Sequence, residues 1–450
     1  MTVMVCIAVT ILICGFGWYI ESRMALSLTP FVIFSVYFIL RVIPGFTVGI
    51  HRYDLDPLYA AMMPVACSGF FLGYFSSRRP HLSEVGVWTA IARSDSKSSY
   101  EWRIAVFAVI VLAAGLALYR GVPPSIATAF DLARGSVDTA EAAQLVSDAR
   151  RAISKGHIFE PDSGTGSGVF RELIFVSSLL LLSMAAVYAF ALPGYRSIVA
   201  LIASTVLTYV FVSGDGTRGR FVVVITSLFI AYTLFRHVRL RHVAIGFVSL
   251  LGLSAFLGIY TNKMISLVAG EAWGEIVQAV LERIFIGNSI NDATAIAAVE
   301  AGFVKYGFGH WLTRDLIALM PGISADKPLA YYLYLFDVGG DSTTYLTGTS
   351  LSRAFVDGWL PGVFVYFALL GFIAALSGTV VKALPNLSVG ARLGLMVALW
   401  VAAGQCYVSG VAGVLFLVGM CIALALILGF VIACSPAYNS PARLLETEDR

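Results

Sequence analysis

Apolar stretches of membrane-spanning length alternate with polar connections along nearly the whole chain. A helix needs roughly 20 mostly apolar residues to cross about 30 Å of hydrocarbon. These runs are too long and too continuous for barrel strands, so the pattern predicts an all-α, polytopic helical membrane protein. Eleven transmembrane helices are expected, at about 3–20, 26–43, 57–76, 103–119, 169–190, 196–213, 221–235, 243–261, 360–381, 391–408 and 411–434.

Two connections are much longer than the others, and they interrupt what is otherwise a single integral membrane domain over residues 1–450. They cover residues 120–167 and 262–359. In the first, Asp138 and Glu141 resemble an N-cap pair that opens an amphipathic helix. In the second, apolar residues between 273 and 284 recur at helical spacing, with polar residues on the other face. Such helices either lie over the membrane and the bundle as a lid or simply cap the bundle.

The basic residues of the short connections predict how the chain is oriented. Lys and Arg collect in the connections at 77–102 and 236–242, and they also flank the connection near 383–390. All three are odd-numbered connections, and positive charge favours the cytoplasmic side. The two long loops are even-numbered, so both are expected outside, with the N-terminus outside and the acidic tail inside.

Composition supports a membrane class and excludes several others. The chain is 58% hydrophobic and only 13% charged, against roughly 25% charged residues in soluble domains. A net charge of +3 is too small to indicate nucleic-acid binding. The six cysteines lie in or beside apolar runs, without the spacing of a metal site. Nucleotide-loop and metallohydrolase motifs are absent, so no cofactor and no metal are predicted.

The short sixth connection contains the first candidates for ligand binding. Its sequence SGDGTRGR ends in Arg218 and Arg220. Planar guanidinium groups match the oxygens of a diphosphate, and the glycines let the backbone approach a ligand closely. The alternative is a turn whose arginines reach lipid headgroups. Positive charge in a short outer loop runs against the usual bias, which favours the functional interpretation.

The long loops supply further candidates of two kinds. Proton transfer would fall to Asp215 of the sixth connection or to His310, Asp337 and Asp341 of the eighth. Diphosphate binding would involve Arg314, Lys327 and Arg353 of the eighth connection and Arg150 and Arg151 of the fourth. Most of these charges are expected simply to be solvated, and cations that end a helix stabilise it anyway. Tyrosines between 331 and 345 suit either sugar stacking or an interfacial belt.

Three short motifs stand out in this arrangement: GTRGR at 216–220 before a span, MPGISADKP at 320–328 and GTSLSRAFVDGWLPG at 348–362. They resemble motifs of Wzy-type polymerases, which join the repeat units of O-antigen or capsular polysaccharide. The resemblance implies a membrane glycosyltransferase of the bacterial cytoplasmic (inner) membrane. Its substrates would be undecaprenyl-diphosphate-linked oligosaccharides, and its partners membrane lipids and a polysaccharide chain-length regulator.

Other functions stay open at this point. An O-antigen ligase uses the same donor and would give similar motifs. A flippase for lipid-linked oligosaccharides belongs to another class, and it is expected to place charge inside the bundle and to show repeated halves. No internal repeat is visible. A structural membrane protein has no clear need for loops this rich in Arg and Gly.

Overall fold

The computed structural model describes most of the transmembrane bundle and part of the long connections. The described residues are 1–23, 29–76, 89–138, 166–212, 218–235, 286–317, 327–339, 348–382, 387–404 and 406–433, with 141, 144, 145, 214 and 282 besides.

The described secondary structure is entirely helical. The elements are α1 (Thr2–Arg23), α2 (Pro30–Tyr37), η1 (Phe38–Val42), α3 (Ile43–Arg52), η2 (Pro57–Ala61), α4 (Met62–Ser76), α6 (Lys97–Tyr119), α7 (Pro124–Ala133), α9 (Gly166–Ala191), α10 (Tyr195–Val212), α11 (Arg218–Phe235), η4 (Gly287–Ser289), α15 (Ile290–Glu300), α16 (His310–Ile317), α17 (Leu329–Asp337), α18 (Ser350–Lys382), α19 (Val389–Gly404) and α20 (Cys406–Ala433). The all-α expectation therefore holds for these residues.

Seven of the described helices are long and apolar enough to cross a membrane. They correspond to seven of the eleven expected spans. Three further expected spans coincide with shorter apolar helices, Val223–Phe235, Val389–Gly404 and Gly413–Ile427. The expected span at 243–261 lies outside the described residues. The protein is a polytopic helical membrane protein.

Two helix boundaries differ from the expected ones. The second span continues to Arg52 instead of ending near 43. Within it, η1 is a π-helical turn in which Ile43 N–H reaches the carbonyl of Phe38. Pro44 explains the irregularity, because it has no N–H and its ring clashes with the carbonyl one turn earlier. The ninth helix begins at Ser350, but its backbone is non-helical at Gly358 and Trp359, so the segment after this break starts at the expected position 360.

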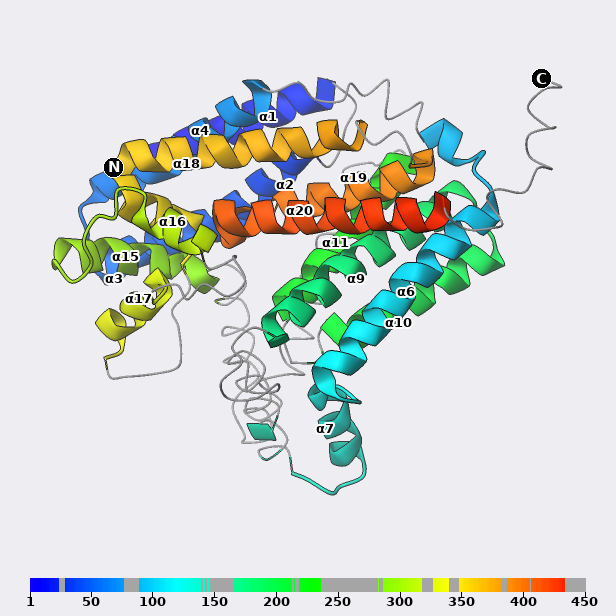
Figure 1. Ribbon diagram of the computed structural model, residues 1–450. Coiled ribbons are helices and arrows are strands. Elements are labelled where there is room, and N and C mark those ends of the chain that lie inside the picture. The colour runs from blue at the N-terminus through cyan, green and yellow to red at the C-terminus, as the bar shows by residue number, and fades with distance from the viewer. Residues whose placement is uncertain are drawn as a thin grey trace.

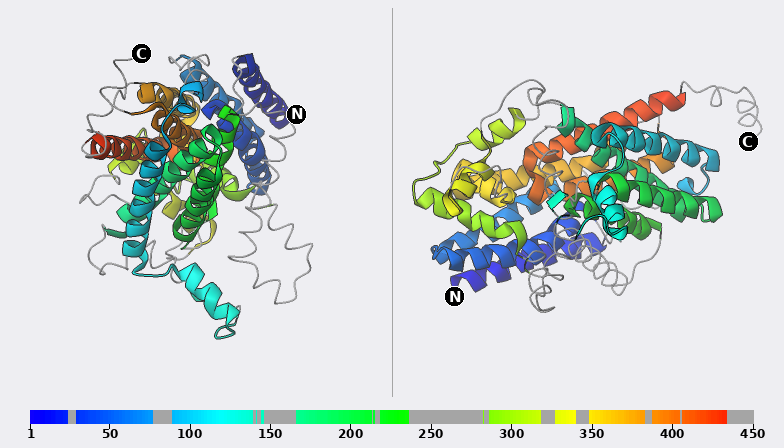
Figure 2. Two further views of the ribbon diagram at one scale, coloured as in Figure 1. Left: turned by 90° about the vertical axis from the view of Figure 1, so that its right-hand side faces the viewer. Right: turned by 90° about the horizontal axis from the view of Figure 1, so that it is seen from below.

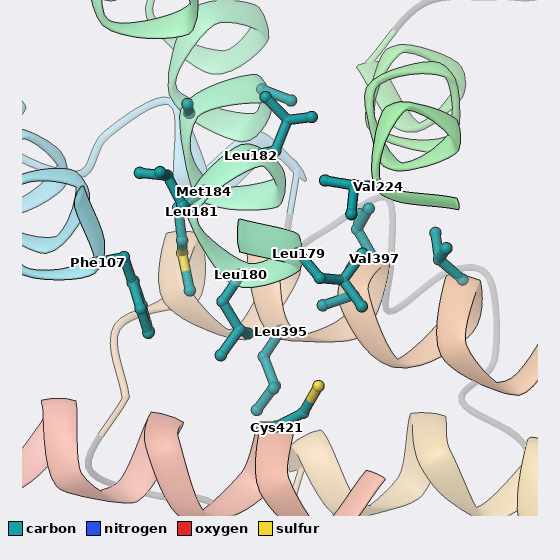
Figure 3. Close-up of a cluster of buried hydrophobic side chains, with 14 of the residues drawn as sticks. Phe107, Leu179, Leu180, Leu181, Leu182, Met184, Val224, Leu395, Val397 and Cys421 are labelled. Carbon is teal, nitrogen blue, oxygen red and sulfur yellow. The ribbon is translucent and has the colours of Figure 1, made fainter. Parts of the chain in front are cut away.

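The helices pack around two clusters of buried apolar side chains, the cores of two bodies that share α19 and α20; Figures 1 and 2 show how the helices are arranged. In the first core, α9 is surrounded by α6, α10, α11 and α19. Figure 3 shows its leucines, such as Leu180, among Phe107, Leu395 and Cys421 from the neighbouring helices. The second core joins α1, α3, α4, α15 and α18. This second body carries the end of the bundle on which the described part of the eighth connection sits.

Glycines allow α4 and α18 of the second body to touch backbone to backbone. A Cβ at Gly69 or Gly73 would collide with carbonyl oxygens of α18, and a Cβ at Gly371 would collide with α4. Small residues at such spacing are a usual device for close helix packing in membranes. The two helices run in the same direction, because Gly69 faces Phe364 and Gly73 faces Ala368. The start of α18 therefore lies at the same end as the start of α4.

Contacts between connections agree with the predicted alternation of the two ends. The second and eighth connections meet where the Tyr53 hydroxyl donates to Asp337. The sixth and fourth meet where Gly214 packs on Pro123. At the opposite end, Gly390 N–H donates to Asp95 at 2.9 Å, which joins the third and ninth connections. In Figure 1 the N-terminus lies at the end that carries α15, α16 and α17.

Candidate functional site

The first turn of α18 is held by a carboxylate from a different helix. Asp292 of α15 is fully buried. Its oxygens accept the Thr349 N–H at 2.8 Å, the Thr349 hydroxyl at 2.7 Å and the Ser352 N–H at 3.2 Å. A helix start has unpaired N–H groups and a partial positive charge, and a carboxylate satisfies both. Gly348 leaves room for this contact, since a Cβ there would lie 3.1 Å from Asp292.

Burial raises the pKa of Asp292 to about 6, although the hydrogen bonds from Thr349 and Ser352 act to lower it. A carboxyl group with such a pKa is suited to acid–base chemistry. However, Asp292 has no exposed surface, and both of its oxygens are used by the start of α18. We therefore assign it to positioning the residues that follow Ser352.

A second carboxylate fixes α16 against α18. Asp357, two turns into α18, accepts the N–H groups of Trp311 and Leu312 at 2.9 and 2.8 Å. Gly307, whose N–H donates to the carbonyl of Val356 at 2.7 Å, brings the chain into α16. A Cβ at Gly307 would lie 2.7 Å from the Asp357 carboxylate, so this approach requires glycine. Asp357 of α18 therefore caps the start of α16 and fixes the position of α16 against α18.

Capping in this way brings two of the predicted arginines together on one carboxylate. Arg314 of α16 and Arg353 of α18 approach the two different oxygens of Asp315, at 2.9 and 3.3 Å. The side chains of Arg314, Asp315 and Arg353 are 16%, 20% and 28% exposed. We call Arg314 and Arg353 the arginine pair site, and Asp315 occupies it. Two cations share one anion there, and the groups are reachable from solvent.

A row of neighbouring aromatic rings runs from α16 to α17. The ring of His310, which is exposed, lies 5.2 Å from that of Trp311. Trp311 meets the ring of Tyr332 at 5.7 Å, and Tyr332 meets Tyr331 at 5.5 Å. The Lys327 ammonium then lies over the Tyr331 ring at 5.2 Å. His310 and Lys327 therefore stand at the two ends of one aromatic row.

Asp337 has a structural environment at the far end of α17. Its carboxylate accepts the Tyr53 hydroxyl and lies 3.6 Å from the Arg52 guanidinium. The Tyr53 oxygen in turn accepts the Thr294 hydroxyl at 2.9 Å. Burial, and then the Asp337 carboxylate, raises the pKa of Tyr53. These bonds tie α17 to α3 and α15, so Asp337 is already engaged by a cation and a phenol.

The remaining predicted residues are located only in part. Arg218 and Arg220 stand in the first turn of α11, at the connection that packs on Pro123. Asp215, Asp341, Arg150 and Arg151 lie outside the described residues, as does the expected amphipathic helix at 273–284 apart from Glu282. Within the described part of the chain, no group of three or more His, Cys, Asp and Glu side chains is arranged to hold a metal ion.

Two charged positions near this end were not among the predicted site residues. Asp315 follows Arg314 directly and looks like one more solvated acid in a polar loop. Arg41 stands in η1, inside the span Pro30–Arg52, and its guanidinium adjoins Gly287 at the start of the described eighth connection. Only Arg41 gave a signal in the sequence, as a cation within an apolar run.

No protein-family model, no curated protein and no solved structure matches the chain. The resemblance to Wzy-type polymerases therefore rests on the sequence motifs alone.

Proposed function

We propose that the protein polymerises undecaprenyl-diphosphate-linked oligosaccharide repeat units at the outer face of the bacterial cytoplasmic membrane. The observation that supports this most is the arginine pair site beside an aromatic row at one end of a membrane bundle. Guanidinium groups bind diphosphate oxygens through planar, charge-assisted hydrogen bonds. Aromatic rings stack on the apolar faces of sugars. A lipid-linked glycan presents both groups next to each other.

The reaction would be a glycosyl transfer in which a hydroxyl of the acceptor sugar attacks the anomeric carbon of the donor. The bond from that carbon to the diphosphate oxygen breaks, and undecaprenyl diphosphate leaves with the bonding electrons. Arg314 and Arg353, together with Arg218 and Arg220, would stabilise the charge that develops on the leaving group. His310 is exposed at the end of the aromatic row, so it is the described candidate for accepting the hydroxyl proton.

A deletion strain distinguishes a polymerase from a ligase. Loss of a polymerase leaves single repeat units on the final acceptor and removes the polymer, which a glycan gel resolves directly. Loss of a ligase instead leaves polymer on undecaprenyl diphosphate. Normal polymer on its usual acceptor in a strain without a second polymerase would refute the proposal.

One observation favours a flippase as a second candidate. Arg41 lies within a span, about 16 Å along the helix from Arg52 if each of the intervening residues rises 1.5 Å. Charges at membrane depth usually mark a substrate path or a structural partner. A flippase predicts that the deletion strain traps lipid-linked repeat units on the cytoplasmic side. Labelling those units with an impermeant reagent in spheroplasts, before and after lysis, separates the two functions.

A further inference from the structure

We propose that Asp315 occupies the arginine pair site as an internal stand-in for a ligand diphosphate, and that the diphosphate displaces it on binding. The inference rests on the proposed function for the kind of diphosphate concerned, which is lipid-linked. It adds a residue with a distinct role, since Asp315 would compete with the ligand instead of contacting it.

The geometry of the three side chains supports an exchange. Arg314 and Arg353 approach different oxygens of one carboxylate, from two separate helices. The non-bridging oxygens of a phosphate group present a similar pair of acceptors, so the same two guanidinium groups can take a phosphate in place of the carboxylate. Asp315 is 20% exposed, and therefore its side chain has room to leave the pair and become solvated.

The surrounding charges favour an anion at this position. Asp357 is close enough to Asp315 for their charges to interact, but it accepts the N–H groups of Trp311 and Leu312 at the start of α16. Its charge is balanced there by the helix end. Arg314, Arg353 and Asp315 together carry a net charge of +1. Asp315 thus reduces the repulsion between the two guanidinium groups while no ligand is bound.

This role predicts a gain of affinity on mutation, which a purely structural ion pair does not. Asp315→Asn keeps the size of the side chain and removes the competing charge, so the net charge of the site rises to +2. Bringing a diphosphate next to this site should then become more favourable, by about tenfold or more in affinity for a charge removed at a distance of a few ångströms. If Asp315 only braces α16 against α18, its loss should loosen the arginines and weaken anion binding.

The experiment uses the full-length protein in nanodiscs, with inorganic pyrophosphate and farnesyl diphosphate as probes. Dissociation constants are measured for the wild type, Asp315→Asn, Asp315→Glu and Arg353→Gln, with Asp54→Asn as a matched control at an exposed carboxylate. We expect Asp315→Asn to bind pyrophosphate about tenfold more tightly, Asp315→Glu and Asp54→Asn to match the wild type, and Arg353→Gln to bind more weakly. Thermal melting without ligand shows that each variant is folded, and Asp315→Ser replaces the Asn variant if that variant does not accumulate.

The outcomes separate this inference from the proposed function. Equal or weaker pyrophosphate binding by a folded Asp315→Asn variant overturns the exchange. Tighter binding, with farnesyl diphosphate preferred over pyrophosphate, supports both the exchange and a lipid-linked donor. Tighter binding of both probes with no preference for the lipid supports the exchange and counts against a lipid-linked donor at this site.

Discussion

Replacing Asp292 with Asn should remove a specific part of the pH dependence of stability. The pKa of this carboxyl group is raised from 3.8 to about 6 by burial. The folded protein therefore holds the proton more tightly than the unfolded chain does. Stability contributed by protonation is greatest in acid and is lost as the pH rises from about 4 to about 6. The shift of roughly 2 units corresponds to about 3 kcal/mol over that window.

Between pH 5 and pH 7 the expected change is smaller, because the carboxyl group of the unfolded chain ionises near pH 4 and part of the loss therefore occurs below pH 5. With a pKa of about 6 in the folded state, the wild type should lose roughly 1 kcal/mol of unfolding free energy across this interval through this group. The Asn side chain does not titrate, so this contribution should vanish. A loss of this size corresponds to a change in Tm of roughly 1–3 °C.

The hydrogen bonds predict that Asn is tolerated and Ala is not. Asn keeps one oxygen for the N–H groups of Thr349 and Ser352, and its amide can donate to the Thr349 hydroxyl, which can rotate to accept. Asp292→Ala leaves three buried donors without an acceptor, at a cost of about 3–5 kcal/mol. The Ala variant should therefore accumulate poorly in the membrane, whereas the Asn variant should not.

Melting curves of purified protein in detergent, at pH 5 and pH 7, measure the effect. The quantity compared is the difference in Tm between the two pH values for the wild type, for Asp292→Asn and for the exposed control Asp54→Asn. If Asp292→Asn and the wild type show the same difference, the carboxylate does not titrate in this range and the reasoning from burial is refuted.

Three further predictions address packing, chemistry and orientation. Gly73→Ala should lower the amount of folded protein in the membrane, because its methyl group would collide with a carbonyl oxygen of α18. Gly15→Ala should not, because Gly15 faces open space; fluorescence-detected size-exclusion chromatography compares the two variants. Arg218→Ala should reduce polymer synthesis by about tenfold to a few hundredfold, and Arg218→Lys should restore it only in part; equal rates for variants with normal membrane levels would assign the diphosphate elsewhere. In a cysteine-free background, Phe308→Cys should react with an impermeant maleimide in intact spheroplasts and Ser94→Cys only after lysis; the reverse pattern would invert the topology.

Seven of the eleven expected spans could be predicted from the sequence, because hydrophobic length is a local property of the chain. The N-cap at Asp138 was also predictable, and Glu141 N–H does donate to it at 2.7 Å. The expected start of the ninth span, at 360, coincides with the point where helical geometry resumes after the break at Gly358 and Trp359. The helical segment before that break was not predicted, and it begins at Ser350 because Asp292, far away in the sequence, caps it. That capping depends on tertiary contact, which no local pattern contains.

The same difference between local sequence and tertiary contact applies to the site residues. Residue type alone identified Arg314 and Arg353 as candidates, since guanidinium groups suit a diphosphate. Their meeting at Asp315 could not be predicted, because it depends on how α16 packs against α18. Asp337 was chosen for its charge, but that charge is engaged by Tyr53 and Arg52. Chemistry can be inferred from composition, whereas which charges are already engaged depends on the fold.

The arginine pair site depends on two buried carboxylates that do not belong to it. Asp292 fixes the turn that ends at Ser352, directly before Arg353. Asp357, further along the same helix, fixes Trp311 and Leu312 at the start of α16, within one turn of Arg314. Two guanidinium groups repel each other, so bringing both to one small anion requires rigid supports on each side. The helix ends supply those supports, because each presents several N–H groups to a single carboxylate. A site assembled in this way holds its cations in place before any ligand arrives, and preorganised charge of this kind is what a departing diphosphate requires.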